Sequence, residues 1–205
     1  MPKGSPELTA ARKEEIVNAC ELLYQTKSFK DITLKDIGNI TSFTRTSIYN
    51  YFQTKEEIFL ALFEREYDRW NDELKSIDSE NSTLTKEEFA KKIANSLAAR
   101  QQLLKLLSMN NYDMEANSRP ECLASFKRAY GESLKIMNEL LDKFFPSKTT
   151  QEKRNVIYVF FPFMFGIYPY TSVTEKQKEA MKEAKVDFKY QTVFDITYDC
   201  LMRIL

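Results

Sequence analysis

The segment from Thr33 to Lys55 contains two short helical patterns in a space too small for a domain. Apolar residues recur at helical spacing over 34–40, and Thr33 followed by Asp36 forms a weak capping box in front of them. Three residues then interrupt the pattern, and Thr44 can cap a second helix behind the interruption. Two short helices joined by so tight a turn are typical of a helix-turn-helix.

The second of these helices has one apolar side and one small, polar side. At about 100° per residue, Ile48 lies on the buried side, and Thr46 and Asn50 lie nearly opposite. Arg45 in the first turn can reach outward, and residues 44–55 contain no acid. Such a surface suits the base edges and phosphates of a DNA major groove. The alternative is the polar face of a helical hairpin that only packs against its neighbours.

A family resemblance is carried by residues 37–52, IGNITSFTRTSIYNYF, and by TKEEI at 54–58. This segment resembles the N-terminal signature of the tetracycline-repressor (TetR) family of bacterial transcription regulators. The shared features are a short helix, a three-residue turn, a Tyr-x-Tyr-Phe ending and a lysine that starts the next helix. Gly38, Ser42 and Thr46 depart from the commonest family residues, and none of these departures removes the motif.

The resemblance implies a three-helix DNA-binding domain over residues 1–55, with an amphipathic first helix over 9–27 behind the helix-turn-helix. The polar residues of the second helix are candidates for base edges, and the family pattern implies that Tyr49, Tyr51 and Lys55 contact phosphates. The full set of candidate DNA-binding residues is Thr33, Thr44, Arg45, Thr46, Ser47, Tyr49, Asn50, Tyr51 and Lys55.

The remainder of the chain also predicts helices. Only 4 Gly and 6 Pro in 205 residues leave little turn chemistry for sheets, and no strand or internal repeat is indicated. A long helix should begin at Thr54, residues 110–119 should form a loop, and residues 187–205 a last helix. Further helix starts are indicated by Ser or Thr followed three residues later by Glu or Gln, at Thr85, Ser118, Thr149 and Thr174.

The prediction is therefore an all-α protein of nine or ten helices. Its DNA-binding domain over 1–55 would be followed by a larger helical domain for ligand binding and dimerisation over 56–205. By the resemblance, the last two long helices pair with their copies across a two-fold axis into a four-helix bundle. That pairing would place 158–167 and 193–204 near the interface of a homodimer that binds a palindromic operator on double-stranded DNA.

The block from Tyr158 to Tyr170 is apolar and aromatic around the whole helix, so more than one of its faces must be buried. A well-packed core is one explanation. A ligand cavity, opened by a kink at Pro162, is the other, and the resemblance implies such a cavity. A lining of aromatic and Met side chains favours a flat or greasy ligand, cationic ones included. The candidate lining residues are Trp70, Met109, Tyr112, Tyr130, Phe160, Met164 and Tyr168.

Composition excludes several classes of protein. The formal net charge is 0, so any DNA binding must come from a local patch. The chain has no His, no nucleophile elbow, no glycine-rich phosphate loop and no metal-spaced cluster, so we expect neither an enzyme nor a metal or other cofactor. Its 3 Cys are far apart and should be buried thiols in a reducing compartment. The longest apolar run, 156–168, has 13 residues and is too short to span a bilayer, so a cytoplasmic protein with no membrane partner is expected.

The functional prediction is a homodimeric repressor that binds an inverted-repeat operator and is released by a small hydrophobic or aromatic effector of unknown identity. One alternative is a TetR-like DNA-binding protein that lacks a small-molecule inducer and answers to a protein partner. Another is a helix-turn-helix that has lost DNA binding. The retained Tyr49, Tyr51 and Lys55 argue against that last alternative.

Overall fold

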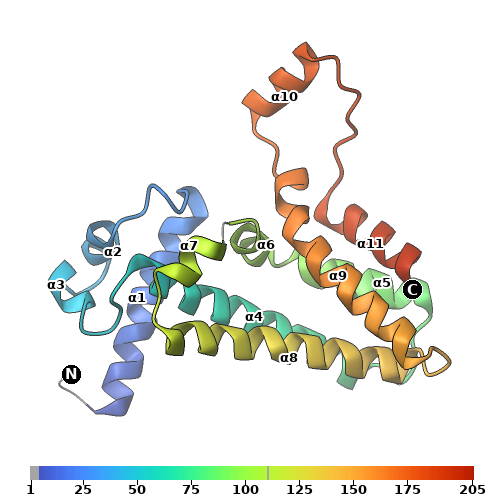
Figure 1. Ribbon diagram of the computed structural model, residues 1–205, viewed down its shortest axis with the longest axis horizontal. Coiled ribbons are helices and arrows are strands. Elements are labelled where there is room, and N and C mark those ends of the chain that lie inside the picture. Colours follow the sequence, from blue (N-terminus) through green and yellow to red (C-terminus); the bar gives the residue numbers. More distant parts are fainter. Residues whose placement is uncertain (1–4, 110) are drawn as a thin grey trace. The chain divides into compact units, whose positions relative to one another are not determined.

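The computed structural model describes residues 5–109 and 111–205, except for the side chains of Arg45 and Asn111. All regular structure in these residues is helical, as Figure 1 shows, so the predicted all-α fold is confirmed. The helices of the described residues are α1 (Pro6–Thr26), α2 (Leu34–Ile40), α3 (Arg45–Ile48), α4 (Lys55–Glu80), α5 (Lys86–Ala98), α6 (Gln101–Leu107), α7 (Asn111–Ala116), α8 (Pro120–Phe144), α9 (Thr150–Thr171), α10 (Glu175–Glu183) and α11 (Val193–Ile204).

The described residues thus form eleven helices, where the sequence predicted nine or ten. The short α7 lies in the segment that was predicted to be a loop, so that prediction was wrong. Met114 is the one apolar residue of α7 that is buried, at 2% exposure. A single buried residue produces no helical periodicity, and the polar sequence around it therefore concealed the helix.

Most of the predicted helix starts are confirmed. Thr33, Thr85 and Thr149 each form a reciprocal capping box, in which the Thr hydroxyl accepts the N–H of a residue three positions later and that residue's carboxylate accepts back. Thr174 caps α10 through the N–H of Gln177. These contacts join residues only three apart, which is why they can be predicted from sequence.

Two predicted helix starts were wrong. Helix α8 begins at Pro120 with the carbonyl of Arg119 accepting the first helical N–H groups, so Ser118 does not cap it. Proline suits the first helical position because no hydrogen bond is required of its nitrogen there. The last helix begins at Val193, where Thr192 and Asp195 form a capping box, and not at residue 187.

The chain divides into two compact units. The head unit comprises the described residues of Met1–Arg65 and Asn110–Tyr130, and the body unit comprises Glu66–Met109 and Gly131–Leu205. Helices α4 and α8 each contribute residues to both units. These bounds differ from the predicted domains 1–55 and 56–205, which stay a prediction.

The head unit is built on a small core in which α2 packs against both α1 and α3. Ile16, Ile37 and Ile48 from these three helices are each fully buried. The ring of Phe59 at the start of α4 closes this core, with edge-to-face contacts to Tyr24 at 5.1 Å and to Phe29 at 4.8 Å between centroids.

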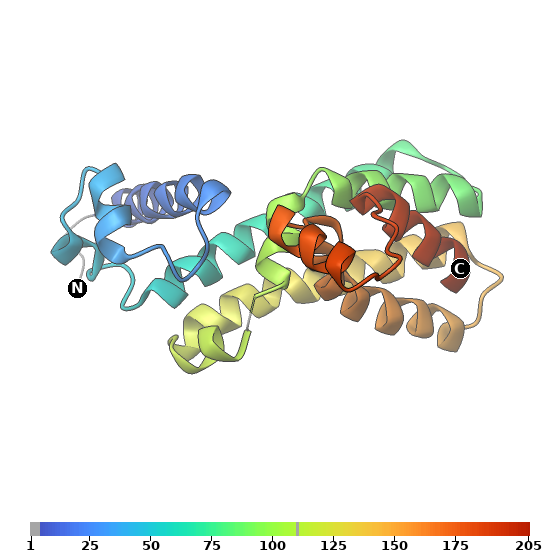
Figure 2. The same ribbon diagram turned by 90° about the horizontal axis from the view of Figure 1, so that it is seen from above.

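In the body unit α11 packs on α5 and α9, and α6 packs on α9; Figure 2 shows these helices from above. Trp70 is fully buried here, and its Nε1 donates a hydrogen bond of 3.0 Å to Oγ of Ser96. Its ring lies 5.9 Å from that of Phe161. The segment 172–192, which we call the arm, includes α10 and stands away from α9 and α11 (Figure 1), and α10 has no buried residue.

Among the described residues, no single helix has both the length and the apolarity needed to cross a membrane. Helices α9 and α10 satisfy those two criteria only when they are taken together, and they meet at a bend of 84°.

The three thiols should differ in reactivity. Cys20 is fully buried, and burial raises the pKa of its thiol to about 12, whereas Cys122 and Cys200 are half-buried. Because the thiolate is the reactive form, we expect iodoacetamide at neutral pH to alkylate Cys122 and Cys200 well before Cys20. Peptide mass mapping over a time course checks this order, with urea-unfolded protein as the control in which all three react. Early labelling of Cys20 in folded protein would contradict its burial.

Candidate DNA-binding site

The helix-turn-helix is formed by α2, the turn over 41–44 and α3. The apolar anchors predicted for α3 are buried: Ile48 is 0% and Phe52 4% exposed. Helix α3 itself has only four residues, fewer than the sequence predicted. Beyond it the chain continues in turns, with the N–H groups of Tyr51 and Phe52 donating to the carbonyl of Ile48 at 2.9 and 3.0 Å.

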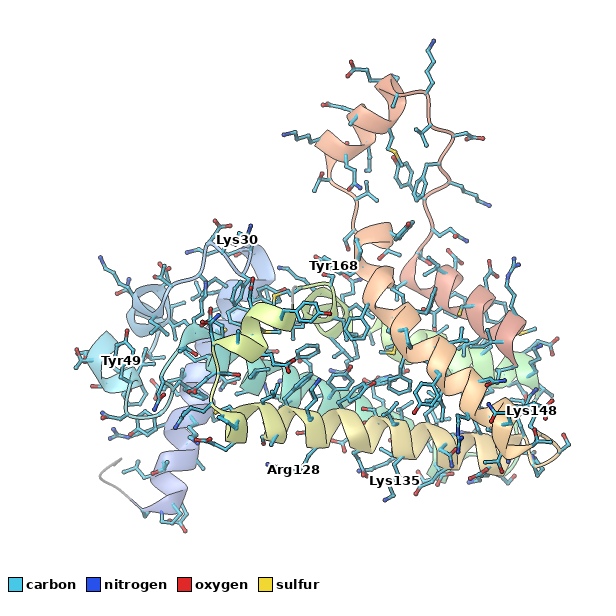
Figure 3. All side chains as sticks on the ribbon, viewed as in Figure 1. Lys30, Tyr49, Arg128, Lys135, Lys148 and Tyr168 are labelled. Carbon is cyan, nitrogen blue, oxygen red and sulfur yellow. The ribbon has the colours of Figure 1, made fainter. Side chains whose placement is uncertain are left out.

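The outer face of α3 carries the small polar residues that the sequence predicted. Thr46 and Asn50 are exposed, and Tyr49 is 45% exposed and lies at the outer edge of the head unit (Figure 3). Thr44 is also exposed; its hydroxyl accepts the N–H of Ser47 at 3.2 Å and lies 3.0 Å from the Ser47 hydroxyl. The side chain of Arg45 lies outside the described residues.

The hydroxyl of Thr33 is engaged in capping. It accepts the N–H of Asp36 at 3.2 Å and donates to the Asp36 carboxylate at 2.6 Å. Hydrogen bonds from the Thr33 hydroxyl and N–H hold the pKa of Asp36 below its usual value. Thr33 itself is exposed, so a nucleic acid can approach it, but its donor hydrogen already has a partner.

Two of the predicted phosphate contacts have partners within the head unit: Tyr51 is buried, and Lys55 is half-buried. Tyr51 is only 7% exposed, and its Oη accepts a hydrogen bond of 3.3 Å from Arg12 of α1. Lys55 donates from Nζ to the carbonyl of Phe29 at 2.7 Å and lies 4.0 Å from the centroid of that ring. Helical periodicity gives the direction of a side chain on its own helix, but not which groups another segment brings beside it.

The seven predicted ligand-binding residues do not all belong to one unit. Trp70, Phe160 and Met164 are fully buried in the body unit, which also contains the half-buried Met109 and Tyr168 (Figure 3). Tyr112 and Tyr130 belong to the head unit, and Tyr112 is 84% exposed. A shared pocket for these residues therefore stays a prediction.

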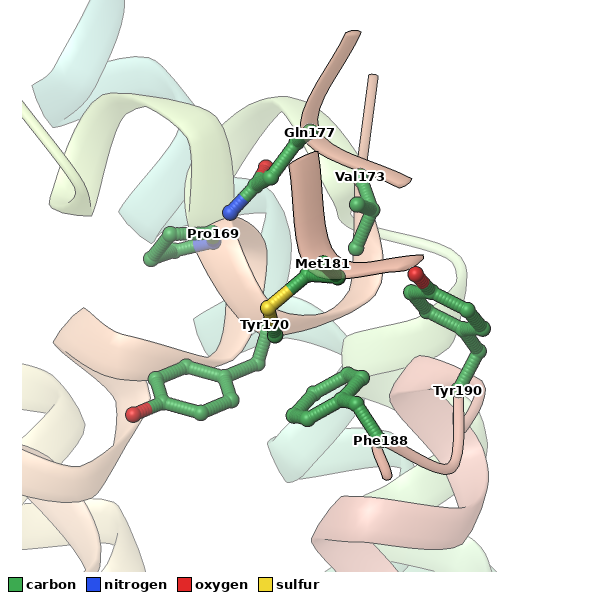
Figure 4. A pocket seen from close by; sticks show the side chains of 7 residues that line it. All are labelled: Pro169, Tyr170, Val173, Gln177, Met181, Phe188 and Tyr190. Atoms are coloured by element: carbon green, nitrogen blue, oxygen red, sulfur yellow. The ribbon is translucent and has the colours of Figure 1, made fainter. Parts of the chain in front are cut away.

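A hollow of about 430 Å³ lies in the body unit between the end of α9 and the arm (Figure 4). Its volume is within the range of small-molecule sites. Aromatic contacts line it, with ring centroids 6.2 Å apart for Tyr170 and Phe188 and 5.2 Å apart for Phe188 and Tyr190. This hollow was not predicted from the sequence, because residues from 187 onward were expected to be helical. The lining residues are Pro169, Tyr170, Val173, Gln177, Met181, Phe188 and Tyr190, none of them predicted.

Across residues 5–109 and 111–205, no three Asp, Glu or Cys side chains are grouped so that they could hold a metal ion. The two units thus present an exposed polar α3 in the head and an apolar hollow in the body.

A family model described as "Tetracyclin repressor-like, C-terminal domain" matches residues 64–198, which is more than half of the chain. This chain belongs to the TetR family of transcriptional regulators. The family that the N-terminal signature indicated is thereby confirmed by a match to a different part of the chain.

A curated relative, described as an uncharacterized HTH-type transcriptional regulator YfiR from Bacillus subtilis (strain 168), is 33% identical over 63 residues. The match covers 31% of this chain and 31% of that relative, so it spans about a third of the relative's length.

Solved structures share the fold over nearly the whole chain. The fatty acid degradation regulator FadR from Bacillus halodurans aligns over 100% of this chain and 97% of its own, with 18% identity and a TM-score of 0.59. FadR from Bacillus subtilis, in complex with stearoyl-CoA, covers 93% and 96%, with 17% identity and a TM-score of 0.61. A putative TetR-family regulator from Mesorhizobium loti covers 96% and 97%, with 15% identity and a TM-score of 0.63.

Proposed function

We propose that this protein is a homodimeric repressor that binds an inverted-repeat DNA operator and leaves it when a small hydrophobic or aromatic ligand binds. The observation that carries DNA binding is the outer surface of α3 and the turn after it, where Thr46 and Asn50 are exposed while Ile48 between them is fully buried. Short hydrogen-bonding side chains on a rigid, anchored turn are suited to base edges in the major groove.

Because the net charge is 0, the phosphates must be held by a local patch. Positive charge in the head unit comes from three exposed lysines: Lys13 of α1, Lys30 in the segment between α1 and α2, and Lys35 of α2. Residues 44–55 carry no acid. Tyr51 bonds Arg12 and Lys55 bonds the Phe29 carbonyl. We therefore assign these two residues to positioning the chain and not to direct contact with phosphates.

The dimer is supported by an apolar face of α9. Tyr158 is 72%, Val159 49%, Phe165 38% and Tyr170 57% exposed. Large apolar residues gathered on one helix face favour burial against another protein surface, and the family pattern makes that surface the same helix of a second copy. Two heads related by a two-fold axis would bind an inverted repeat. A solution mass of one chain at micromolar concentration would rule out this arrangement.

For the ligand, the support is the apolar hollow beside α9 and the apolar body core. One structural neighbour, FadR from Bacillus subtilis, is in complex with stearoyl-CoA. Long-chain acyl-CoA thioesters are therefore the first class to test, followed by flat aromatic compounds. A ligand at one hundred times its Kd should stabilise the fold by about 2.7 kcal/mol, which thermal unfolding detects. A regulator of this kind would act in the cytoplasm.

The alternative, a DNA-binding regulator that answers to a protein partner, is favoured by one observation. Trp70, Phe160 and Met164 are each 0% exposed, so those three predicted lining residues have no open surface in this state. Failure of every compound class to shift the unfolding temperature would support this alternative.

The DNA-binding assignment is tested by Asn50→Ala. Loss of one well-placed base contact costs about 1–3 kcal/mol, so the affinity for the duplex upstream of the protein's own coding region should fall about 5- to 150-fold. Fluorescence anisotropy at several salt concentrations measures this loss, and the salt slope should not change because no phosphate contact is removed.

Asn138→Ala, at an exposed position of α8 where the amide bonds Asp142 at 2.9 Å, is the matched control and should bind as the wild type does. Equal affinity of the Asn50→Ala protein and the wild type would remove Asn50 from the recognition surface.

A further inference from the structure

A buried carboxylate in the head unit joins the first turn of α4 to the residue that precedes α8. Glu57 is 1% exposed. Arg119 donates two parallel hydrogen bonds to its carboxylate, from Nε to Oε1 at 2.7 Å and from Nη2 to Oε2 at 2.8 Å. The N–H of Arg119 donates a third, of 3.1 Å, to Oε1. This two-pronged geometry is specific to arginine, since lysine has no planar pair of donors.

The same group of contacts reaches the chain that follows α3. The N–H of Gln53 donates to Oε2 of Glu57 at 2.8 Å, and Nη2 of Arg119 lies 3.4 Å from the carbonyl of Tyr51. The hydroxyl of Thr54 donates to the carbonyl of Asn117 at 2.8 Å. The Tyr51 carbonyl and the Thr54 hydroxyl are therefore bonded directly to residues 117–119, and the Gln53 N–H is linked to Arg119 through Glu57.

This arrangement replaces an ordinary helix cap. Thr54 accepts the N–H of Glu57 at 3.2 Å, as in a capping box, but the Glu57 carboxylate accepts from Gln53 and Arg119. Burial acts to raise the pKa of Glu57, but the hydrogen bonds from Arg119 and Gln53 outweigh it, so the pKa lies below its usual value. Glu57 is therefore an ionised carboxylate that accepts four hydrogen bonds, one from Gln53 and three from Arg119.

The ion pair is one of several contacts between the start of α8 and α4. Within the head unit, the Phe63 and Phe126 rings lie 4.6 Å apart between centroids, and Ser125 donates to Glu64 at 2.6 Å. These contacts join the two helices further along the chain. What Arg119 adds is a set of bonds to the end of the DNA-reading segment.

We infer that Arg119 is a positioning residue for DNA binding: through Glu57, Gln53 and the Tyr51 carbonyl it holds the chain after α3 in the orientation that reads DNA. This inference rests on the proposed function. Arg119 directly precedes Pro120, the first residue of α8, and both belong to the head unit.

The test compares Arg119→Met with the wild type in binding to a labelled duplex from upstream of the protein's own coding region. We expect the affinity to fall about 5- to 150-fold, the usual range of coupling between sites. The slope of affinity against salt should stay unchanged, because a positioning residue contacts no phosphate, whereas a lost phosphate contact lowers the slope by about one. Arg119→Lys, which keeps the charge without the two-pronged geometry, should restore only part of the affinity.

Arg128→Met, at an exposed position of α8 in the same unit (Figure 3), is the matched control and should bind as the wild type does. Should Arg119→Met fail to fold, Arg119→Lys replaces it, because it keeps the positive charge beside Glu57 and loses the two-pronged geometry. Wild-type affinity in folded Arg119→Met, or in Arg119→Lys when it is needed, overturns the inference and leaves the proposed function standing. A wild type that does not bind the duplex overturns the proposed function and the inference together.

Discussion

Trp70→Ala is expected to lower the free energy of unfolding by about 3–5 kcal/mol. The ring is fully buried, it contacts Phe161, and its Nε1 donates to the buried hydroxyl of Ser96. Truncation therefore leaves a cavity and removes the donor to the Ser96 hydroxyl, which keeps its own bond to the Ile93 carbonyl. Urea unfolding followed by circular dichroism measures the change.

Tyr112→Ala is the informative comparison, because Tyr112 was predicted to line the same ligand pocket as Trp70. Its side chain is 84% exposed, so its truncation should change stability by no more than about 0.5 kcal/mol. A small effect of Trp70→Ala would contradict close packing around the ring and would favour an open cavity there.

Arg65→Met is expected to lower the free energy of unfolding by about 2–3 kcal/mol. Arg65 of α4 is 14% exposed and bonds four residues of α1: the carboxylates of Glu14 at 2.9 Å and Glu21 at 2.5 Å, the amide oxygen of Asn18 and the carbonyl of Val17 at 3.3 Å. Removing the guanidinium takes a close charge-assisted bond away from Glu21, which is itself only 19% exposed. The expected cost is below the 3–5 kcal/mol of a fully buried pair because Glu14 remains largely in water.

Urea unfolding of the purified protein checks the Arg65 prediction, with Arg203→Met at an exposed position of α11 as the control. Arg65→Lys should recover only part of the stability, because an ammonium group has three N–H donors on one atom and cannot bond all four partners at once. Equal stability of Arg65→Met and the wild type would show that apolar contacts alone hold α1 on α4.

Where the prediction from sequence succeeded, the interaction joins residues close together in the chain. The capping boxes at Thr33, Thr85 and Thr149 are examples, and so is the burial of Ile48 and Phe52 on one side of the turn after α3. Where it failed, a distant segment competed for the same group. The Glu57 carboxylate met the spacing of a capping box, but Arg119, distant in the chain, bonds it in the structure.

The DNA-binding surface shows the same division. Exposed Thr46 and Asn50 could be predicted because their direction follows from the helical repeat alone. Tyr51 and Lys55 could not be placed, because Arg12 and the Phe29 carbonyl come from other parts of the chain. The aromatic hollow beside the arm was missed for a related reason, since two of its lining residues, Phe188 and Tyr190, follow α10 in a segment that was predicted to be helical.

By itself the sequence determined the helical class, the family signature and the polar outer face of α3, because helical periodicity and caps act over three or four residues. Only the tertiary structure decided which polar groups of the head unit face water and which are bonded inside it. It also decided that Glu57 is held by Arg119. The physical reason is that a buried charge takes its partners from whatever segments the fold brings within hydrogen-bond distance, and sequence spacing does not contain that information.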